Sequence, residues 1–286
     1  MDPDLVTQSQ TIPLDARSIY LRELVIQALE GGGRGHVGST LSLIEIFRVL
    51  YDEILALRPA EPNWPGRDRC ILSKGHGCLA LYALLADKGF FGLDALARQC
   101  CAEAMLGGHP ERGHIPGVEA STGALGHGLS LGVGMALGLR LKGQDETSVY
   151  VVMGDGELDE GSVWEAAMSA AKHRLSNLVA LVDYNKLQSY GPISEVLGLE
   201  PLADKWRAFG FSVFEANGHD VAGLKNTILQ ARAGEGPSVV ICHTVKGKGF
   251  DMAEGEASWH HKAKISPADV EQMRAALSRA AHPREG

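Results

Sequence analysis

The second half of the chain alternates short apolar runs with longer amphipathic segments, and this alternation most restricts the possible folds. The apolar runs, rich in Val, Ile and Leu, occur in TSVYVVMGDG, LVALVDYN, FSVFEAN and SVVICHTV. Unbroken runs of this kind are typical of strands buried on both faces, and the intervening helices provide the crossovers that parallel strands need. We therefore predict an α/β fold in which helices cover both faces of a parallel sheet.

The first half of the chain predicts mostly helices and loops. We expect amphipathic helices at residues 14–31 and from a cap at Ser39 or Thr40 to about Leu57. A short strand at RCILSK should precede a helix that begins with the glycines of GHG at residues 75–77. The segment GHGLSLGVGMALGLRLKG carries small residues on one face, which predicts a tightly packed and buried helix.

Length and composition indicate one domain. The chain has 286 residues, 45% of them hydrophobic, which is sufficient for one large core. No repeat, low-complexity segment or clear linker interrupts the pattern. We predict a single domain over residues 1–286, with an ordered core of about 14–282 and a few disordered residues at each end.

Charge and targeting features exclude several classes of protein. The net charge of -8 argues against a nucleic-acid surface, which needs a basic face. The N-terminus is polar and acidic, unlike a signal peptide, and no apolar stretch reaches the roughly 20 residues that span a bilayer. The five cysteines are odd in number and lack metal-ligand spacing, which predicts reduced thiols and a cytoplasmic protein.

Two polar positions directly follow strand-like runs and suggest a metal site. Asp155 follows the first of these runs, and Asn185 follows the next one about thirty residues later. Ligands of parallel sheets sit outside the carboxyl ends of the strands, so neighbouring strands would bring both side chains to one crevice. With the carbonyl of Leu187 they offer three oxygens that suit Mg²⁺ or Ca²⁺ and, through the metal, a diphosphate. GDG by itself is more often a common tight turn, whereas the pair is the more demanding pattern.

The spacing from GDG to Asn185 resembles the thiamine-diphosphate motif. Seven segments in the same order resemble the transketolase family over roughly residues 15–262: GRGHVGSTLS, LSKGHGCLALYALL, GGHPE, VEASTGALGHGLSLGVGMA, GDGELDEG, DYNKLQ and TVKGKG with SWHHK. They match the N-terminal, pyrophosphate-binding third of a full-length member. In a split transketolase this third is a separate subunit.

The resemblance implies a set of cofactor and metal ligands. It implies that Asp155, Asn185 and the Leu187 carbonyl bind the metal, Mg²⁺ or Ca²⁺. An imidazole N–H of His76 would donate a charge-assisted hydrogen bond to the diphosphate. The full set implied for thiamine diphosphate is His76, Gly123, Leu125, Gly154, Gly156 and Asn185.

Four further residues are implied to be catalytic. His36, His109 and His260 match family histidines around the reactive carbon of the cofactor and the sugar. Imidazole titrates near neutral pH and can exchange protons with sugar hydroxyls. Glu160 matches a carboxylate at the subunit interface, which supports a catalytic Glu on the partner. His261 is interpreted as a neighbour of His260 with no catalytic part.

Four polar residues near these motifs receive no firm role. His127 stands where many full-length members carry Gln, so the resemblance assigns it nothing. Lys246 and Lys248 either draw an anionic sugar phosphate towards the site or belong to a solvated loop. Glu157 is interpreted as an ordinary acid at the start of a helix.

The implied enzyme lacks a pyrimidine-binding domain within this chain. That domain supplies the Glu that activates the cofactor, and the residues after SWHHK are too few to form it. We therefore expect a separate C-terminal transketolase subunit, an α₂β₂ assembly and an obligate interface above about 2,000 Å². The expected reaction transfers a two-carbon ketol unit from a ketose, or ketose phosphate, to an aldose or aldose phosphate.

Three alternatives stay open at this point. Another thiamine-diphosphate enzyme subunit is one: deoxyxylulose-phosphate-synthase-like, 2-oxoacid dehydrogenase-like, or a transketolase-like enzyme of specialised metabolism. A non-catalytic regulatory subunit that retains the motifs is the second. A nicotinamide-binding Rossmann enzyme is weaker, because no GxGxxG is followed by an acidic residue about 20 positions later.

Overall fold

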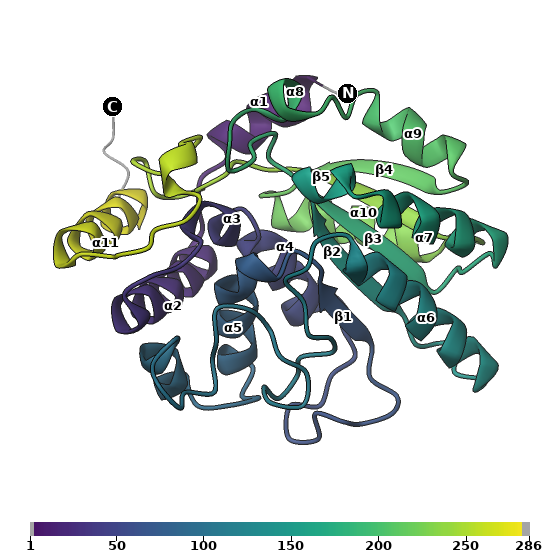
Figure 1. Ribbon diagram of the computed structural model, residues 1–286, viewed down its shortest axis with the longest axis horizontal. Coiled ribbons are helices and arrows are strands. Elements are labelled where there is room, and N and C mark those ends of the chain that lie inside the picture. Colours follow the sequence, from purple (N-terminus) through teal and green to yellow (C-terminus); the bar gives the residue numbers. More distant parts are fainter. Residues whose placement is uncertain (1–2, 282–286) are drawn as a thin grey trace.

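The computed structural model describes residues 3–281, and the outermost residues, for which the sequence predicted disorder, lie outside the described residues. Its centre is one sheet of five parallel strands in the order β1-β2-β3-β5-β4 (Figure 1). The strands are β1 (Arg69–Leu72), β2 (Val149–Gly154), β3 (Leu178–Tyr184), β4 (Ser212–Asn217) and β5 (Ser238–His243).

Helices cover both faces of this sheet, which confirms the predicted fold class. Side chains of β2 alternate between two apolar cores, with Tyr150 and Val152 in one and Val149 and Val151 in the other. The first core includes residues of α2 (Ala16–Gly32), α4 (Ile44–Val49), α5 (Cys78–Asp87), α10 (Val221–Arg232) and α11 (Pro267–Ala281). The second includes residues of α6 (His127–Leu141), α7 (Gly161–Lys172) and α9 (Leu202–Ala208) (Figure 1).

The ordered structure begins earlier than the predicted start near residue 14. Residues Pro3–Thr11 form helix α1, which packs against β4 and β5. The ammonium group of Lys248 donates to the carbonyl of Gln10 at 2.8 Å. A tertiary contact to a distant loop therefore holds this polar helix, and such a contact leaves no local pattern in the sequence.

The helix predicted from Ser39 or Thr40 to about Leu57 is divided into three pieces. They are α3 (Val37–Leu41), α4 and the π-helical η1 (Leu50–Ile54), and neither predicted cap residue starts a helix. At the break, Ser42 donates from its hydroxyl to a carboxylate oxygen of Asp183 at 2.5 Å. This hydrogen bond ties Ser42 to a buried carboxylate on β3. A tertiary contact therefore outweighs the local pattern that predicted one continuous helix.

Helix α6 is buried on one side only, which corrects the prediction of a buried helix. A Cβ atom on Gly132 would lie 2.4 Å from Val151, so this glycine allows close packing on β2. On the other side Leu131 and Leu141 are 41% and 81% exposed. The remaining short elements are η2 (Gly75–Gly77), η3 (Leu93–Arg98), η4 (Gly156–Asp159), α8 (Ile193–Val196) and η5 (Ala257–Trp259).

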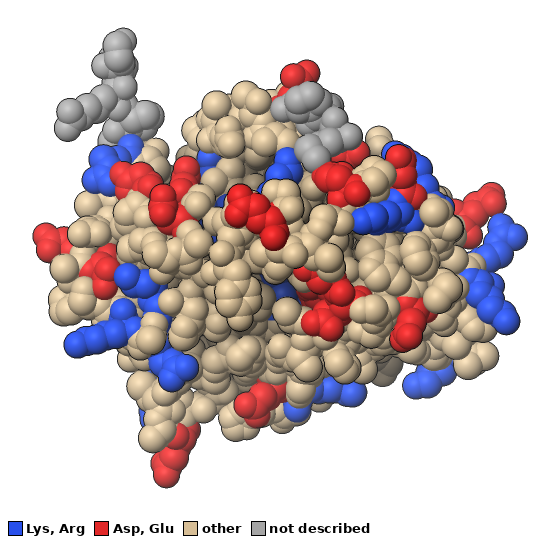
Figure 2. All heavy atoms as spheres, turned by 45° about the horizontal axis from the view of Figure 1, so that its top comes forward, with Lys and Arg blue, Asp and Glu red and all other residues tan. Residues whose placement is uncertain are grey.

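Helix lengths and the distribution of surface charge describe the exterior of the molecule. Among residues 3–281, no helix combines the length and apolar content that a membrane crossing needs. Figure 2 shows basic and acidic side chains interspersed over one face of the molecule, with no broad basic surface on that face.

Candidate functional site

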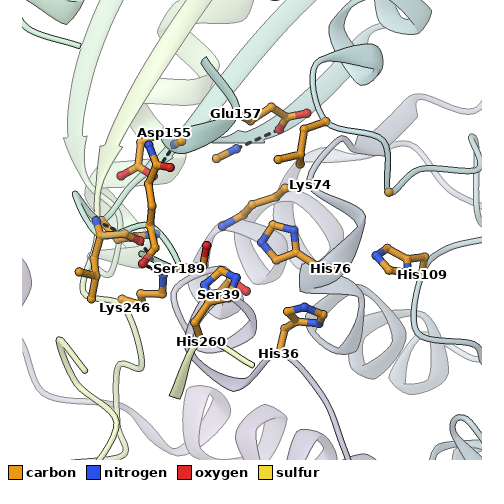
Figure 3. A pocket seen from close by; sticks show the side chains of 17 residues that line it. His36, Ser39, Lys74, His76, His109, Asp155, Glu157, Ser189, Lys246 and His260 are labelled. Carbon is orange, nitrogen blue, oxygen red and sulfur yellow. Dashed lines mark hydrogen bonds between the residues drawn. The ribbon is translucent and has the colours of Figure 1, made fainter. Parts of the chain in front are cut away.

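A cavity of about 290 Å³ lies at the carboxyl ends of β1, β2, β3 and β5. It collects most of the residues that the sequence motifs singled out, although they come from segments far apart in the chain (Figure 3). The predicted residues that line it are His36, His76, His109, Gly123, Leu125, Gly154, Asp155, Gly156, Asn185, Leu187 and His260. Glu160 is the one predicted site residue that does not line it.

Asp155 and Asn185 meet because β2 and β3 are direct neighbours. Gly154, the last residue of β2, pairs with Asp183 of β3, so both side chains follow adjacent strand ends. The carboxylate of Asp155 is buried and accepts main-chain N–H bonds from Gly156, at 2.7 Å, and from Lys186. Gly156, which the resemblance places at the diphosphate, thus directs its N–H to Asp155.

The oxygen atoms of Asp155, Asn185 and Leu187, at the metal end of the cavity, are suitable ligands for a hard divalent cation. Asn185 Oδ1 accepts the Leu187 N–H at 3.1 Å, and each carbonyl or carboxylate oxygen retains a further lone pair. Among residues 3–281, no three His, Cys, Asp or Glu side chains form a metal cluster, so a metal here would use amide and main-chain oxygens as well.

The side chain of Lys246 reaches into the metal end of the cavity. The ammonium group of Lys246 donates to the Leu187 carbonyl at 2.5 Å. Burial, together with the nearby carboxylate of Asp183, raises the pKa of Asp155 to about 6. A metal ion bound here would offset the burial of the Asp155 carboxylate and its repulsion by Asp183. The residues present therefore fit the implied metal.

Behind Asn185 lies a buried pair that the sequence reasoning missed. Asp183 is completely buried and accepts hydrogen bonds from Lys74, Ser42 and Thr244. Its Oδ2 also accepts the Asn185 amide N–H at 3.3 Å, and the same oxygen binds the Lys74 ammonium. Asn185 is therefore oriented by a charge pair whose members come from β3 and from the residue before η2.

Glu157 is also part of the site, which corrects its interpretation as an ordinary helix-start acid. It is buried, and its carboxylate accepts bonds from the N–H groups of Gly126, at 2.9 Å, and Gly154, at 3.2 Å, and from the Ser73 hydroxyl. Burial raises its pKa. These bonds connect the loop before α6 to the ends of β1 and β2.

Four histidines surround the opposite part of the cavity. The ring centre of His36 lies 5.2 Å from that of His76, 5.6 Å from that of His260 and 6.3 Å from that of His109. Gly123 has φ of +150°, and a Cβ there would come within 2.9 Å of the His109 ring. This glycine therefore allows the loop before α6 to run directly beside His109.

Burial keeps several of these rings neutral. Together with nearby cationic side chains, it lowers the pKa of His36 to about 4 and that of His260 to about 3. Burial also holds the pKa of His76 well below its usual value. His260 Nδ1 and the Ser39 hydroxyl are buried without a hydrogen-bond partner among the described residues, so the cavity holds polar atoms available to a ligand.

The neutral rings predict how the stability of the chain depends on pH. Because the unfolded chain binds protons at the usual histidine pKa of 6.5, the free energy of unfolding should fall as pH decreases below 6.5. The contribution of His36 should level off near pH 4. Chemical denaturation from pH 7 to pH 4.5 checks this, and His36→Asn should reduce the slope. Titration of the His36 ring near pH 6.5 in NMR spectra would contradict the prediction.

Three other residues lie outside the cavity. Glu160 is exposed and precedes the first turn of α7, where its side chain caps no N–H group. His127 is exposed at the start of α6, with Nδ1 3.0 Å from the Leu125 carbonyl. Lys248 is buried and bonded to α1, so it belongs neither to a solvated loop nor to the site.

Two lysines that received no firm place in the site from the sequence also belong to the cavity. Lys74 and Lys246 lie in the quoted motifs LSKGHG and TVKGKG, and both line the cavity. Burial lowers the pKa of Lys246 to about 8, with Lys74 adding to the shift. Ser39 and Gln188 also lie in quoted segments, GRGHVGSTLS and DYNKLQ, but only packing between segments distant in sequence brings them to the cavity.

A parallel sheet with a polar cavity at its carboxyl ends defines the class of α/β ligand-binding domains. The chain belongs to the transketolase family: residues 15–284 match the model described as "Transketolase, thiamine diphosphate binding domain". This membership confirms the predicted resemblance, and thiamine diphosphate is the cofactor of that domain.

Two relatives are similar to this chain over most of their own length. The 6-deoxy-6-sulfo-D-fructose transketolase subunit SqwG of Clostridium sp. (strain MSTE9) is 42% identical over 253 residues, which cover 88% of this chain and 92% of the relative. One subunit of the apulose-4-phosphate transketolase of Phocaeicola vulgatus is 39% identical over 266 residues, 93% of this chain and 94% of the relative.

Longer transketolases match in one part only. The human transketolase is 36% identical over 245 residues, which are 85% of this chain but 38% of that protein. The crystal structure of the Campylobacter jejuni transketolase superimposes with a TM-score of 0.84 at 29% identity, covering 97% of this chain and 43% of that chain. This chain therefore spans less than half the length of these transketolases.

Proposed function

We propose that this chain holds thiamine diphosphate through a divalent cation and, with a separate pyrimidine-binding subunit, transfers a two-carbon ketol unit from a ketose to an aldose. The observation that carries this proposal is the cavity that joins Asp155 and Asn185 to the cluster of neutral histidines. One end of the cavity suits a metal diphosphate, and the other suits a polyhydroxylated substrate.

The metal end of the cavity holds the cofactor in this proposal. Asp155, Asn185 and the Leu187 carbonyl bind Mg²⁺ or Ca²⁺. His76, Gly154 and Gly156 line the diphosphate site, while Gly123 and Leu125 contact the cofactor from the loop before α6. When bound there, thiamine diphosphate would supply the nucleophilic carbon and the electron sink that ketol transfer needs. The residues of this chain bind and orient the diphosphate and, through the metal, neutralise its charge.

The histidine end of the cavity moves protons on the substrate. A neutral imidazole accepts a proton at one ring nitrogen and donates from the other. Since burial keeps His36 and His260 neutral at neutral pH, both can accept a proton from a sugar hydroxyl. His109 lines the same cavity from the loop before Pro110 and takes the third position around the substrate.

The partner protein completes the site. Glu160 is exposed outside the cavity, where it can meet a Glu of the partner. The relatives that match over nearly their whole length are named as transketolase subunits. Helix α6 offers an apolar docking face, because Leu131 and Leu141 are exposed and a Cβ atom added at Gly134 or Gly138 would meet no other segment within 4 Å. The α₂β₂ assembly and the cytoplasmic location are parts of the same proposal.

The substrates of the two relatives that are subunits carry an acidic group. Their names specify 6-deoxy-6-sulfo-D-fructose and apulose 4-phosphate. For this chain we propose a substrate of the same general kind, a ketose or aldose that bears a phosphate or a sulfonate.

Reconstitution tests the proposed function. This chain, combined with a pyrimidine-binding transketolase subunit, thiamine diphosphate and Mg²⁺, should transfer a ketol unit between ketose donors and aldose acceptors. The chain alone should bind the cofactor more weakly and show no turnover. A reaction that requires pyruvate and uses no ketose would favour the decarboxylating alternatives. An assembly that never binds the cofactor would favour a regulatory role.

A further inference from the structure

Three buried polar residues form a cluster outside the cavity. They are Arg22 on α2, Glu45 on α4 and His219, which lies in the loop after β4, and each is at most 4% exposed. Arg22 donates to the two carboxylate oxygens of Glu45 at 2.6 and 3.0 Å, and His219 Nδ1 lies 2.7 Å from Glu45 Oε2. None of the three lines the cavity, and the proposed function gives them no part.

This buried cluster holds the loop that follows β5 on both sides of Lys246. Val245 donates its main-chain N–H to His219 Nε2 at 2.9 Å. The carbonyl of Lys248 accepts the Nε–H of Arg22 at 2.8 Å. The main chain of Lys246 therefore lies between two points that are bonded to the same cluster, although the residues of that cluster come from three distant segments.

The loop reaches the metal end of the cavity through Lys246. The ammonium group of this residue donates to the Leu187 carbonyl at 2.5 Å, which is one of the oxygens proposed for the metal. A displacement of the loop would therefore move a cation beside the metal site and remove a hydrogen bond from one of its ligands.

The same loop also bonds to the backbone that carries His36. Gly247 donates its N–H to the Gly38 carbonyl at 3.0 Å, two residues after His36. On the other side of His36, Gly35 and Lys262 form an antiparallel bridge with N–H···O bonds of 3.0 and 2.9 Å. The position of the loop after β5 therefore bears on both ends of the cavity.

The hydrogen bonds of His219 define which ring nitrogen carries its proton. A main-chain N–H can only donate, so Nε2 accepts from Val245 through its lone pair. The ring proton then resides on Nδ1 and is donated to Glu45. Burial acts to raise the pKa of Glu45, but Arg22 and His219 outweigh this effect and hold the pKa below its usual value, so the acceptor stays ionised. The imidazole is thus held from both sides.

We propose that His219 is a positioning residue of the cofactor site: anchored by the buried ion pair, it holds Val245 so that Lys246 stands beside the oxygens of the metal end. This inference rests on the proposed function and adds to it a determinant that touches neither cofactor nor substrate. When the acceptor at Nε2 is lost, the Val245 N–H has no partner and the loop shifts. Affinity for thiamine diphosphate and Mg²⁺ falls as a consequence.

Two substitutions of His219 separate its two hydrogen bonds. In Asn, the amide nitrogen takes the place of Nδ1 and can donate to Glu45, but nothing replaces the acceptor at Nε2. In Gln, the amide oxygen takes the place of Nε2 and can accept from Val245, but the donor to Glu45 is lost. Calorimetry on the assembled enzyme in Mg²⁺ should show that His219→Asn weakens thiamine-diphosphate binding about 10-fold, whereas His219→Gln stays within about 3-fold of the wild type.

Asp68→Asn is the matched control for a loss of stability. The Asp68 side chain is also buried and accepts two main-chain N–H bonds, from Ala56 at 2.9 Å and from Ser148 at 2.7 Å. It precedes β1, at the opposite end of the sheet from the cavity. This variant should lower the free energy of unfolding without changing cofactor affinity. Wild-type affinity in His219→Asn, or equal losses in the Asn and Gln variants, would overturn the proposal.

Two readouts on the chain need no cofactor. Nitrogen NMR shifts of the wild-type His219 ring should show a proton on Nδ1 and none on Nε2 at neutral pH, and a proton on Nε2 would also overturn the proposal. The Val245 N–H should exchange with solvent about 10-fold faster in His219→Asn than in the wild type or His219→Gln. If the wild-type assembly binds no cofactor, the proposed function fails, while these two measurements still decide whether His219 holds the loop.

Discussion

Replacing Asp155 with Asn should lower the affinity of the assembled enzyme for thiamine diphosphate in Mg²⁺ by about 100-fold or more. Both oxygens of Asp155 accept main-chain N–H bonds, from Gly156 and Lys186. An Asn amide has one oxygen, so its NH₂ group must face one of these donors. The substitution therefore removes the only carboxylate of the proposed metal ligands and also disturbs their orientation.

The stability of the chain without cofactor separates this effect from misfolding. Since burial raises the pKa of Asp155 to about 6, its charged form costs the folded state stability at pH 7. Removing the charge raises the free energy of unfolding, while the N–H donor left facing the Asn amide lowers it. Asp155→Asn should therefore change the free energy of unfolding little, while binding measured by calorimetry is lost. Glu165→Gln, on the exposed side of α7, is the control and should bind as the wild type does. Wild-type affinity in Asp155→Asn would refute the proposed metal site.

Replacing Lys74 with Met should destabilise the chain by about 3–5 kcal/mol, because it leaves the carboxylate of Asp183 buried without its charge partner. Burial acts to raise the pKa of Asp183, but Lys74 and the hydroxyl donors outweigh it and hold this pKa below its usual value. Stability from this pair is therefore present above the unfolded pKa of 3.8 and is lost as pH falls through the folded pKa. The difference between Lys74→Met and the wild type should shrink at acidic pH.

A second substitution distinguishes the charge effect from lost packing. The aliphatic part of Lys74 packs against Gly154, and Met preserves much of that contact. Adding Asp183→Asn removes the buried charge, so the double variant should be more stable than Lys74→Met alone. Urea denaturation of the two variants and the wild type measures this. A loss below about 1 kcal/mol in Lys74→Met would show that the pair contributes little, contrary to our expectation.

The sequence predicted those parts of the site that lie directly after recognisable strands. Strand ends could be recognised from apolar runs, so the position of Asp155 relative to Asn185 followed once β2 and β3 were assumed to be neighbours. Glu157 could not be assigned in this way. Its carboxylate folds back onto Ser73 and Gly126, and only the packing of the loop before α6 brings these donors together.

The burial of individual residues was harder to predict from the sequence than the type of secondary structure. The small residues of α6 predicted burial, but Gly134 and Gly138 face open space while Gly132 packs on β2. The sequence left Lys248 either near the site or in a solvated loop, yet it is buried because α1 supplies an acceptor at Gln10. In both cases the residue type is compatible with solvent and with the protein interior. Whether it is buried depends on a segment that is distant in the sequence.

By itself, the sequence determined the parallel α/β class, because unbroken apolar runs separated by amphipathic segments can be buried on both sides only between helices. Its motifs also identified the transketolase family. Tertiary structure alone decided which charges meet. Lys74 reaches Asp183 across more than a hundred residues, and the Gly35–Lys262 bridge sets His261 beside His36. Such contacts depend on the closure of long loops, and no periodicity in a single chain encodes the partner.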